Sequence, residues 1–230
     1  MKALVIDSAA SCMTICAKNE NEKVSLSIDL GMKQSKKLLP AIDYVLKEVE
    51  LAPKDLDYTA LCSGPGTFTG LRLAFSALKA IELAHDVPVY GIRTLDAYAE
   101  PFLGFSSPVV SVVDAKKDQF FVSLYNNGTA LLESADTNAC DVCSEIKKHG
   151  LDSRMIFVAG ADAKIFAEKL LSIEPTLQLA CFDEKIDVSQ SLFNLAEKAM
   201  ALGESPLKDY DGPLYFRKSE AELNLENSAK

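Results

Sequence analysis

The chain lacks tryptophan altogether and has only two histidines, His85 and His149, among its 230 residues. These two cannot form the H-x-x-x-H pair that binds zinc from one face of a helix. Their positions also indicate no pairing with serine or cysteine in a hydrolytic site. We therefore expect no catalytic residue and no metal site, which also argues against a peptidase.

Long apolar runs are missing too, because no stretch approaches the roughly 20 residues that cross a membrane. The first residues, MKALVID, pass directly into a strand pattern that contains Asp7. They have no long apolar core and no small-residue cleavage site, so they do not resemble a signal peptide. We expect a cytoplasmic protein without a membrane partner.

Positive charge is scarce, since the formal net charge is −9 and the isoelectric point is about 4.8. Proteins that bind nucleic acid by themselves usually present a basic face, because neutralising phosphates supplies much of the affinity. The acidic balance therefore argues against direct binding of RNA by this chain alone.

The six cysteines include one close pair, Cys140 and Cys143, in the sequence NACDVCSE. A structural zinc site would need a second such pair. The other four lie in or beside apolar runs, where a free cysteine packs as a small hydrophobic residue. We expect neither metal binding nor redox chemistry from the pair, although the C-x-x-C spacing alone leaves both open.

Apolar periodicity predicts the element order β-β-β-α-β-α-β-α twice. In the first half, strands are predicted over 3–8, 12–18, 23–30, 58–63 and 87–92, and helices over 36–49, 68–84 and 94–102. In the second half, strands are predicted over 108–115, 119–127, 130–136, 154–160 and 177–182, and helices over 141–149, 162–172 and 189–203. The repeat lies in the order of elements, with little similarity of residues between the halves.

Two such halves predict an α/β fold of two mixed sheets with helices on their faces. This order is typical of the duplicated, ribonuclease-H-like arrangement of actin, Hsp70 and sugar kinases, the actin-like or ASKHA fold. We expect an N-terminal lobe over 1–104, a C-terminal lobe over 105–218 and a polar tail over 219–230. The fold by itself does not give the function.

The sequence SGPGTFTGLR, residues 63–72, places glycines between a strand and a helix. A P-loop needs lysine after its last glycine, but leucine and arginine follow Gly70 here. The dinucleotide fingerprint fails as well, because its third glycine comes one residue late. We interpret the segment as a tight turn that positions the helix. Gly64 and Gly66 supply unusual backbone angles, Pro65 stiffens the turn, and Gly70 lets another backbone approach.

The helix after this turn has two apolar faces. Leu71, Ala74, Phe75, Leu78 and Ile81 form the first face, and Leu73, Ala77, Ala80 and Ala84 form the second. A helix that covers one sheet needs a single apolar face. The second face therefore predicts contact with a partner, unless its alanines serve only as good helix formers.

Each half begins with a strand that ends in aspartate, at Asp7 and Asp114. In two-lobed nucleotide-dependent enzymes of this fold, such acids face each other across a cleft and bind magnesium. The hairpin after Asp7 could bring backbone amides, that of Ser8 among them, to a phosphate. This predicts Asp7, Ser8 and Asp114 as nucleotide contacts of an ATP-dependent phosphotransferase. The alternative is that each aspartate forms a turn at a strand end.

Several segments together resemble the markers of the bacterial TsaB family, also called YeaZ. They are ALVIDSA, LLPAIDYVL, SGPGTFTGLRLAFSALKAI, VDAKKDQFF, VAGADA and PLYFRKSEAE, which occur in the family's order and span nearly the whole chain. The resemblance implies an actin-like fold and a role in forming N6-threonylcarbamoyladenosine in tRNA. In that system, the paralogue TsaD carries the metal-binding histidines and transfers the threonylcarbamoyl group. TsaB-like proteins support TsaD without catalysis, and the ATPase TsaE joins them.

The resemblance also implies that the two N-lobe helices pair with TsaD, or with a second copy when the chain is alone. The partner surface would then comprise Leu38, Ile42, Val45, Leu73, Ala77, Ala80 and Ala84. No cofactor would be required, ATP or ADP would bind weakly or in the assembled complex, and tRNA would be reached through that complex. One departure is Gln34, where many members have histidine, beside Lys33, Lys36 and Lys37.

Overall fold

The computed structural model describes residues 1–29, 31–182 and 187–216, apart from the side chains of 31–33. Within these residues, the chain forms the two mixed five-stranded sheets that the periodicity predicts. Among them, no helix has the length and apolar character needed to cross a membrane. The predicted tail over 219–230 lies outside the described residues.

The N-terminal sheet has the strand order β3-β2-β1-β4-β5. Its strands are β1 (Lys2–Asp7), β2 (Cys12–Asn19), β3 (Glu22–Asp29), β4 (Tyr58–Gly64) and β5 (Val89–Arg93). β1, β2 and β3 are antiparallel, whereas β4 and β5 run parallel to β1. Helices α1 (Leu38–Glu48) and α2 (Phe68–His85) cover one face. Short 3-10 turns, η1 (Gly31–Lys36) and η2 (Pro53–Asp55), precede α1 and β4.

The C-terminal sheet repeats this plan with the order β8-β7-β6-β9-β10. Its strands are β6 (Val109–Asp114), β7 (Phe120–Asn126), β8 (Thr129–Thr137), β9 (Met155–Ala159) and β10 (Gln178–Phe182). Helices α4 (Ala139–Lys148) and α5 (Ala163–Ile173) cover one face. The matching strand orders confirm the duplicated actin-like fold.

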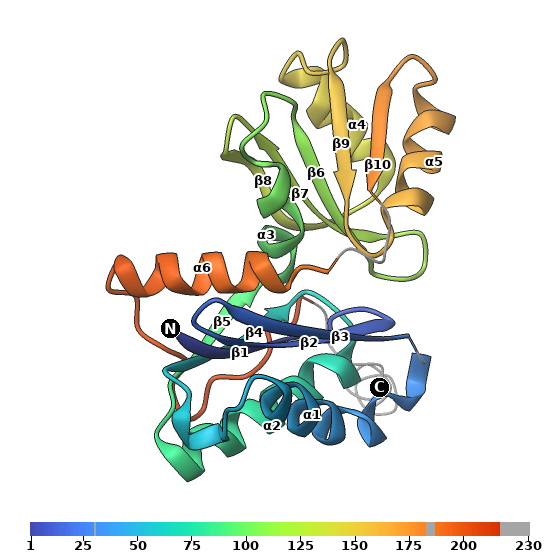
Figure 1. Ribbon diagram of the computed structural model, residues 1–230. Helices are drawn as coiled ribbons and strands as arrows, with labels where there is room; N and C mark the ends of the chain where they lie inside the picture. Colours follow the sequence, from blue (N-terminus) through green and yellow to red (C-terminus); the bar gives the residue numbers. More distant parts are fainter. Residues whose placement is uncertain (30, 183–186, 217–230) are drawn as a thin grey trace.

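The remaining two helices change lobes, which corrects the predicted division of the chain. Helix α3 (Thr94–Ala99) follows the N-terminal sheet but packs on β6 and β7, together with the 3-10 turn η3 (Glu100–Phe102). Helix α6 (Ser189–Ala201) follows the C-terminal sheet but lies along the N-terminal one (Figure 1). A boundary near 104 therefore assigns α6 to the wrong lobe.

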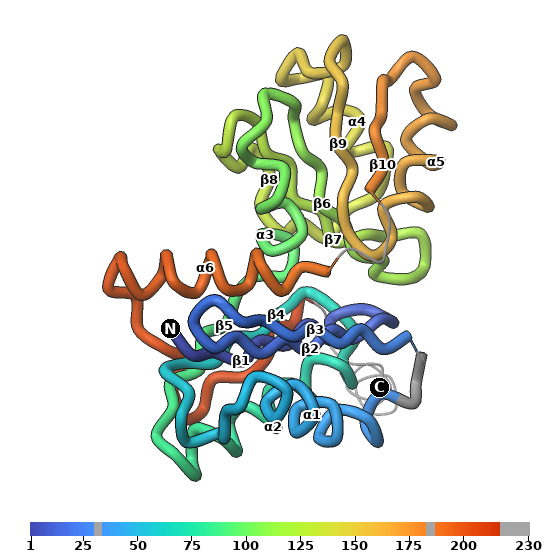
Figure 2. Tube along the Cα trace, in the orientation of Figure 1, coloured from blue at the N-terminus to red at the C-terminus, as the bar shows by residue number. Residues whose placement is uncertain are grey.

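The chain after α6 stays with the N-terminal lobe (Figure 2). The amide of Leu207 donates to the carbonyl of Val89 in β5 at 2.8 Å, and the amide of Leu214 donates to the carbonyl of Ser63 in β4 at 2.7 Å. The Nζ of Lys79 donates to the carbonyls of residues 207 and 208 at 2.9 Å each. This segment therefore fixes the outer side of α2 to the sheet.

Candidate functional site

Asp7 closes β1 and its side chain is buried. Its Oδ1 accepts a 2.9 Å hydrogen bond from the amide of Ala9, and its Oδ2 accepts one of 3.3 Å from the hydroxyl of Tyr98 in α3. Burial raises the pKa of Asp7 above its ordinary value of 3.8, and the hydrogen bonds offset this in part. The carboxyl group is thus sealed under the crossing helix α3.

The cavity beside Asp7 has a volume of about 20 Å³. Asp7 and Tyr98 line one side, and Gly160 and Ala161, from the turn between β9 and α5, line another. Space of this size holds about one water molecule, whereas ligand pockets measure roughly 300–1,000 Å³. In this conformation the cavity beside Asp7 has no room for a nucleotide.

Asp114 lies at a different cavity. Its carboxylate pairs with the Nζ of Lys116 at 2.6 Å, and its amide donates to Asp162 at 2.7 Å. It lines a groove of about 230 Å³, together with the turn before α2 and Phe216. The structure therefore does not bring Asp114 to Asp7, contrary to the predicted pair of acids.

The alternation of side chains along a strand explains this separation. Asp7 shares its side of β1 with Ala3 and Val5, which face α6. Asp114 shares its side of β6 with Val110 and Val112, which pack under α4 and α5. The two acids end equivalent strands, but their positions relative to the apolar residues of each strand differ by one residue. Asp7 therefore lies on the sheet face under α6, whereas Asp114 lies on the face that α4 and α5 cover.

The glycine turn before α2 packs against the β1–β2 hairpin. A Cβ atom at Gly70 would lie 1.9 Å from the carbonyl oxygen of Ser8, and one at Gly66 would lie 2.6 Å from that of Ala9. The hydroxyl of Ser8 donates to the carbonyl of Gly70 at 2.7 Å. The backbone approach predicted at Gly70 is therefore present, and Ser8 binds the turn itself.

Gly64 and Pro65 begin this turn and face the C-terminal segment. Gly64 has a φ of +124°, a conformation that side chains rarely adopt, and a Cβ atom there would lie 2.5 Å from the carbonyl oxygen of Leu214. Pro65 is buried. The turn is thus held between the hairpin and the C-terminal segment.

The α1 residues predicted for the partner surface are inside the lobe. Leu38, Ile42 and Val45 are all buried and belong to the core between the sheet and α1 and α2. Their burial contradicts a direct contact with a partner, because their own sheet covers them. Ala77 of α2 is buried in the same core.

The outer side of α1 and α2 does carry apolar residues. Ala80 and Ala84 are exposed, as their assignment to a partner surface requires, and Leu73 is half-buried. Leu83 is 90% exposed and Leu39 is 67% exposed. Tyr44 on α1 is also exposed. The partner surface predicted from the sequence did not include these large side chains.

Gln34 has a role in the same lobe. It is buried, and its Nε2 donates to the carbonyls of Ala10 at 3.1 Å and Ser11 at 2.6 Å. Gln34 thus places an amide donor against the β1–β2 hairpin. Lys36 and Lys37 are exposed, and the side chain of Lys33 lies outside the described residues.

The cysteine pair lies on α4, with Cys140 exposed and Cys143 buried. Among the described residues, no group of three or more histidine, cysteine or acidic side chains is placed to hold a metal ion. Cys143 packs in the core of the C-terminal lobe, where burial raises the pKa of its thiol.

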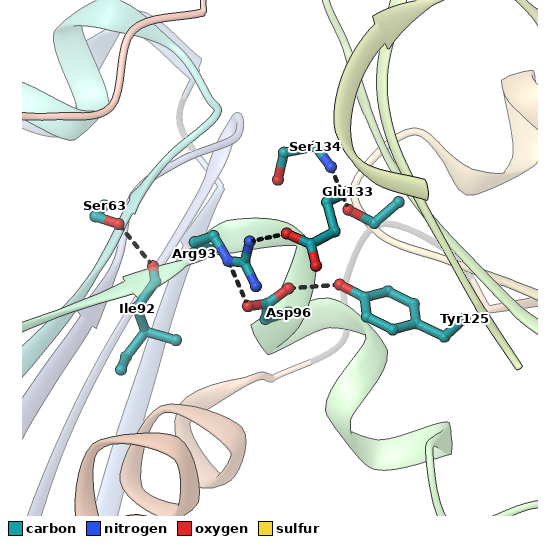
Figure 3. Close-up of polar contacts among 8 residues, drawn as sticks. Ser63, Ile92, Arg93, Asp96, Tyr125, Glu133 and Ser134 are labelled. Carbon is teal, nitrogen blue, oxygen red and sulfur yellow. Dashed lines mark hydrogen bonds and ion pairs between the residues drawn. The ribbon is translucent and has the colours of Figure 1, made fainter. Parts of the chain in front are cut away.

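A polar network joins the lobes where β5 passes into α3 (Figure 3). The Nε of Arg93 donates to Asp96 at 2.7 Å, and its guanidinium reaches Glu133 of β8 at 3.0 Å. The hydroxyl of Tyr125 donates to Asp96 at 2.5 Å. Arg93 and Asp96 thus connect the end of the N-terminal sheet to two strands of the C-terminal sheet.

A family model described as TsaD, tRNA N6-adenosine threonylcarbamoyltransferase, matches residues 31–200. Two relatives are named tRNA threonylcarbamoyladenosine biosynthesis protein TsaB. The one from Bacillus subtilis is 27% identical over 134 residues, which are 58% of each chain. The one from Buchnera aphidicola (Schizaphis graminum) is 28% identical over 176 residues, which are 74% of this chain and 84% of the relative.

The chain belongs to the TsaB/YeaZ group of the TsaD family. It spans 58% of the length of its Bacillus subtilis relative. The solved structure of a Pseudomonas aeruginosa protein, described as similar to peptidase YEAZ, matches with a TM-score of 0.72 at 21% identity. The match covers 94% of this chain and 99% of that one, and it shows a shared fold.

Proposed function

We propose that this TsaB/YeaZ chain is a non-catalytic partner subunit in the biosynthesis of threonylcarbamoyladenosine in tRNA. It binds and supports a TsaD-like catalytic paralogue, and a TsaE-like ATPase joins the assembly. The proposal rests on family membership and on the relatives named for this pathway. It places the chain in the cytoplasm, with tRNA reached through the complex.

The observation that carries the partner role is the outer side of α1 and α2. Leu39 and Tyr44 on α1 and Leu83 on α2 are exposed large side chains, and Ala80 and Ala84 are exposed small ones on α2. Exposed apolar side chains on adjacent helices are typical of an interaction site, and the small side chains let another helix approach closely. The same surface supports a homodimer when the chain is alone.

The proposal requires no cofactor in this chain. Asp7 is sealed under Tyr98 beside a cavity of about 20 Å³, and Asp114 lies at another groove. ATP or ADP would therefore bind weakly, or after partners move the lobes. Calorimetry with ATP and Mg²⁺ on the isolated chain tests the rival phosphotransferase function. Tight stoichiometric binding followed by phosphoryl transfer would favour that rival.

The central test is pairing with the TsaD-like protein of the same organism. We expect the two chains to co-purify and tRNA modification to fall when this chain is depleted. Supplying Leu83→Asp in the depleted strain should restore modification less well than the wild-type chain does. Normal TsaD pairing and full modification without this chain would refute the proposal.

A further inference from the structure

An aromatic pair occupies equivalent places in the two sheets. The rings of Tyr58 in β4 and Tyr90 in β5 lie edge to face, with centroids 6.3 Å apart. Those of Phe157 in β9 and Phe182 in β10 lie edge to face as well, at 5.4 Å. Both pairs lie on the sheet face opposite the two helices of the same lobe.

The strand registers confirm this equivalence. In the N-terminal sheet, Tyr58 is followed two residues later by Ala60, which pairs with Tyr90. In the C-terminal sheet, Phe157 is followed two residues later by Ala159, which pairs with Phe182. Each aromatic residue of the first strand is also paired with the central strand, β1 or β6. The two faces are thus built alike.

The crossing helices cover these faces unequally. Helix α6 has 13 residues and a length of about 20 Å, whereas α3 has six residues and a length of about 9 Å, at 1.5 Å per residue. Leu192 and Phe193 of α6 are buried in one cluster with Tyr58. The hydroxyl of Tyr58 donates to Glu197 of α6 at 2.9 Å. The whole pair in the N-terminal sheet therefore lies beneath a helix.

The pair in the C-terminal sheet is covered only in part, by η3 and the turn after it, and both rings are half-buried. Phe102 contacts Phe182 at a centroid distance of 4.4 Å, and Phe105 contacts Phe157 at 5.7 Å. Phe105 is itself 58% exposed, and Met155, on the same side of β9 as Phe157, is 42% exposed. Among the described residues, Figure 1 shows α4 behind β9 and β10 and no helix in front of them.

We propose that this C-lobe aromatic face, formed by Phe105, Met155, Phe157 and Phe182, binds an amphipathic helix of a partner protein. The helix would lie over β9 and β10 beside η3, as α6 lies over β4 and β5 of the N-terminal sheet. The occupant is assigned by the other lobe, where the same register and the same aromatic pair are buried under a 13-residue helix. This docking surface is separate from α1 and α2, so it does not depend on the function proposed above.

The chemistry of the face defines the helix it accepts. Phe157 and Phe182 have no hydroxyl group, so the partner needs no acceptor equivalent to Glu197. The partner needs apolar side chains spaced three and four residues apart, as Leu192, Phe193 and Ala196 are in α6. The exposed methionine side chain can adapt to different apolar neighbours.

The test uses a fluorescent peptide with the α6 sequence, residues 189–201. A hydrocarbon link across positions 190 and 194, which are exposed in α6, keeps it helical, because short peptides are poorly helical in water. We expect saturable binding to the full chain by fluorescence anisotropy. Hydrogen exchange should show new protection at 155–159 and 178–182. A peptide with Leu192→Asp and Phe193→Asp is the matched control and should not bind.

Two variants of the chain locate the site. Phe105→Asp and Met155→Asp should each lower the affinity for the peptide at least about tenfold, a difference of about 1.4 kcal/mol. Ile165→Asp, at an exposed position on α5, should leave the affinity unchanged. Both target side chains are exposed, so we expect the variants to fold, which thermal unfolding checks.

Three results of the peptide experiments would overturn the proposal. The first is no saturable binding, and the second is equal affinity for wild type and for both variants at the aromatic face. The third is protection at β4 and β5, which would mean that the peptide displaces α6. Sedimentation of the chain alone tests a second copy as the occupant. A dimer that Phe105→Asp separates would assign the face to that copy and refute the helix partner.

Discussion

At the residue scale, Gly66 before α2 and Gly70 in its first turn act through the space they leave. Their hydrogen atoms face the carbonyl oxygens of Ser8 and Ala9, so the turn and the β1–β2 hairpin lie closer than any side chain would allow. The hairpin that could have held a phosphate instead contacts the turn and Gln34. The glycine-rich segment is therefore part of the lobe's packing.

We expect Gly70→Ala to destabilise the chain by about 3 kcal/mol, near the upper end for overpacking, because the new methyl group would lie 1.9 Å from a backbone oxygen. Urea unfolding measures this free energy. Gly104→Ala is the matched control, since nothing lies within 4 Å of its Cβ position. Equal stability of the two variants would contradict the packing role.

Asp7 should make stability depend on pH. Its pKa is higher in the folded chain than in the unfolded chain because burial disfavours the carboxylate. Its contribution to stability is complete below the unfolded value near 3.8 and is lost as pH rises through the raised pKa. Asp7→Asn cannot ionise, so this loss should disappear.

The expected result is that the free energy of unfolding of Asp7→Asn, relative to wild type, increases as the pH rises above the unfolded pKa near 3.8. Urea unfolding at several pH values measures it. Asp152→Asn, at an exposed aspartate, is the control for a general effect of charge. If the difference in free energy of unfolding between Asp7→Asn and wild type did not change with pH, the burial of Asp7 seen in the structure would be contradicted.

At the scale of elements, one side of α2 packs in the core of the lobe and the other side has residues exposed for association with a partner. Its inner side, including Ala77, lies in the core, and the C-terminal segment holds Lys79 on the outer side. Ala80 and Leu83 remain exposed. Changes at Ala77 would therefore test stability, and changes at Ala80 and Leu83 would test binding.

We expect Leu83→Asp and Ala80→Glu to weaken association with the TsaD-like partner at least about tenfold while the chain stays folded. Calorimetric titration of the two purified proteins measures this. Leu202→Asp, an exposed leucine just beyond α6, is the matched control. Ala77→Glu should instead unfold the lobe, because it buries an unpaired charge. Unchanged affinity in both surface variants would place the interface elsewhere.

At the scale of the molecule, the two exchanged helices and the junction at Arg93 make the lobes one unit. Tyr98 of α3 contacts Asp7 of the N-terminal sheet, and α6 returns from the C-terminal sheet to cover the N-terminal one. The junction adds hydrogen bonds from Arg93 and Tyr125 to Asp96 (Figure 3). Stability should therefore depend most on the buried members of this junction.

We expect Tyr125→Phe to lower the free energy of unfolding by about 1–2 kcal/mol, because the variant loses a part-buried hydrogen bond to a charged group. Glu133→Gln should cost less than about 0.5 kcal/mol, since both Glu133 and its partner Arg93 are partly open to water. Denaturant unfolding compares them. A larger cost for Glu133→Gln would contradict this ranking.

The sequence by itself determined the order of elements, both sheets and their duplication, because side-chain periodicity reports which face of each element is buried. It also determined the glycine turn, since residues without side chains mark close approach. Periodicity does not report what covers a face. It therefore could not distinguish burial of Leu38, Ile42 and Val45 by their own sheet from burial by a partner, nor assign α6 to the N-terminal lobe.

Only the tertiary structure decided those points and the separation of Asp7 from Asp114. The two acids end equivalent strands, yet one residue of offset places Asp7 under Tyr98 and Asp114 beside Lys116. Such an offset is invisible in the apolar pattern, because both strands are almost continuously apolar. The tertiary structure also decided how far each aromatic pair is covered. The long helix α6 covers the pair in the N-terminal sheet, whereas the short helix α3 does not extend over the pair in the C-terminal sheet.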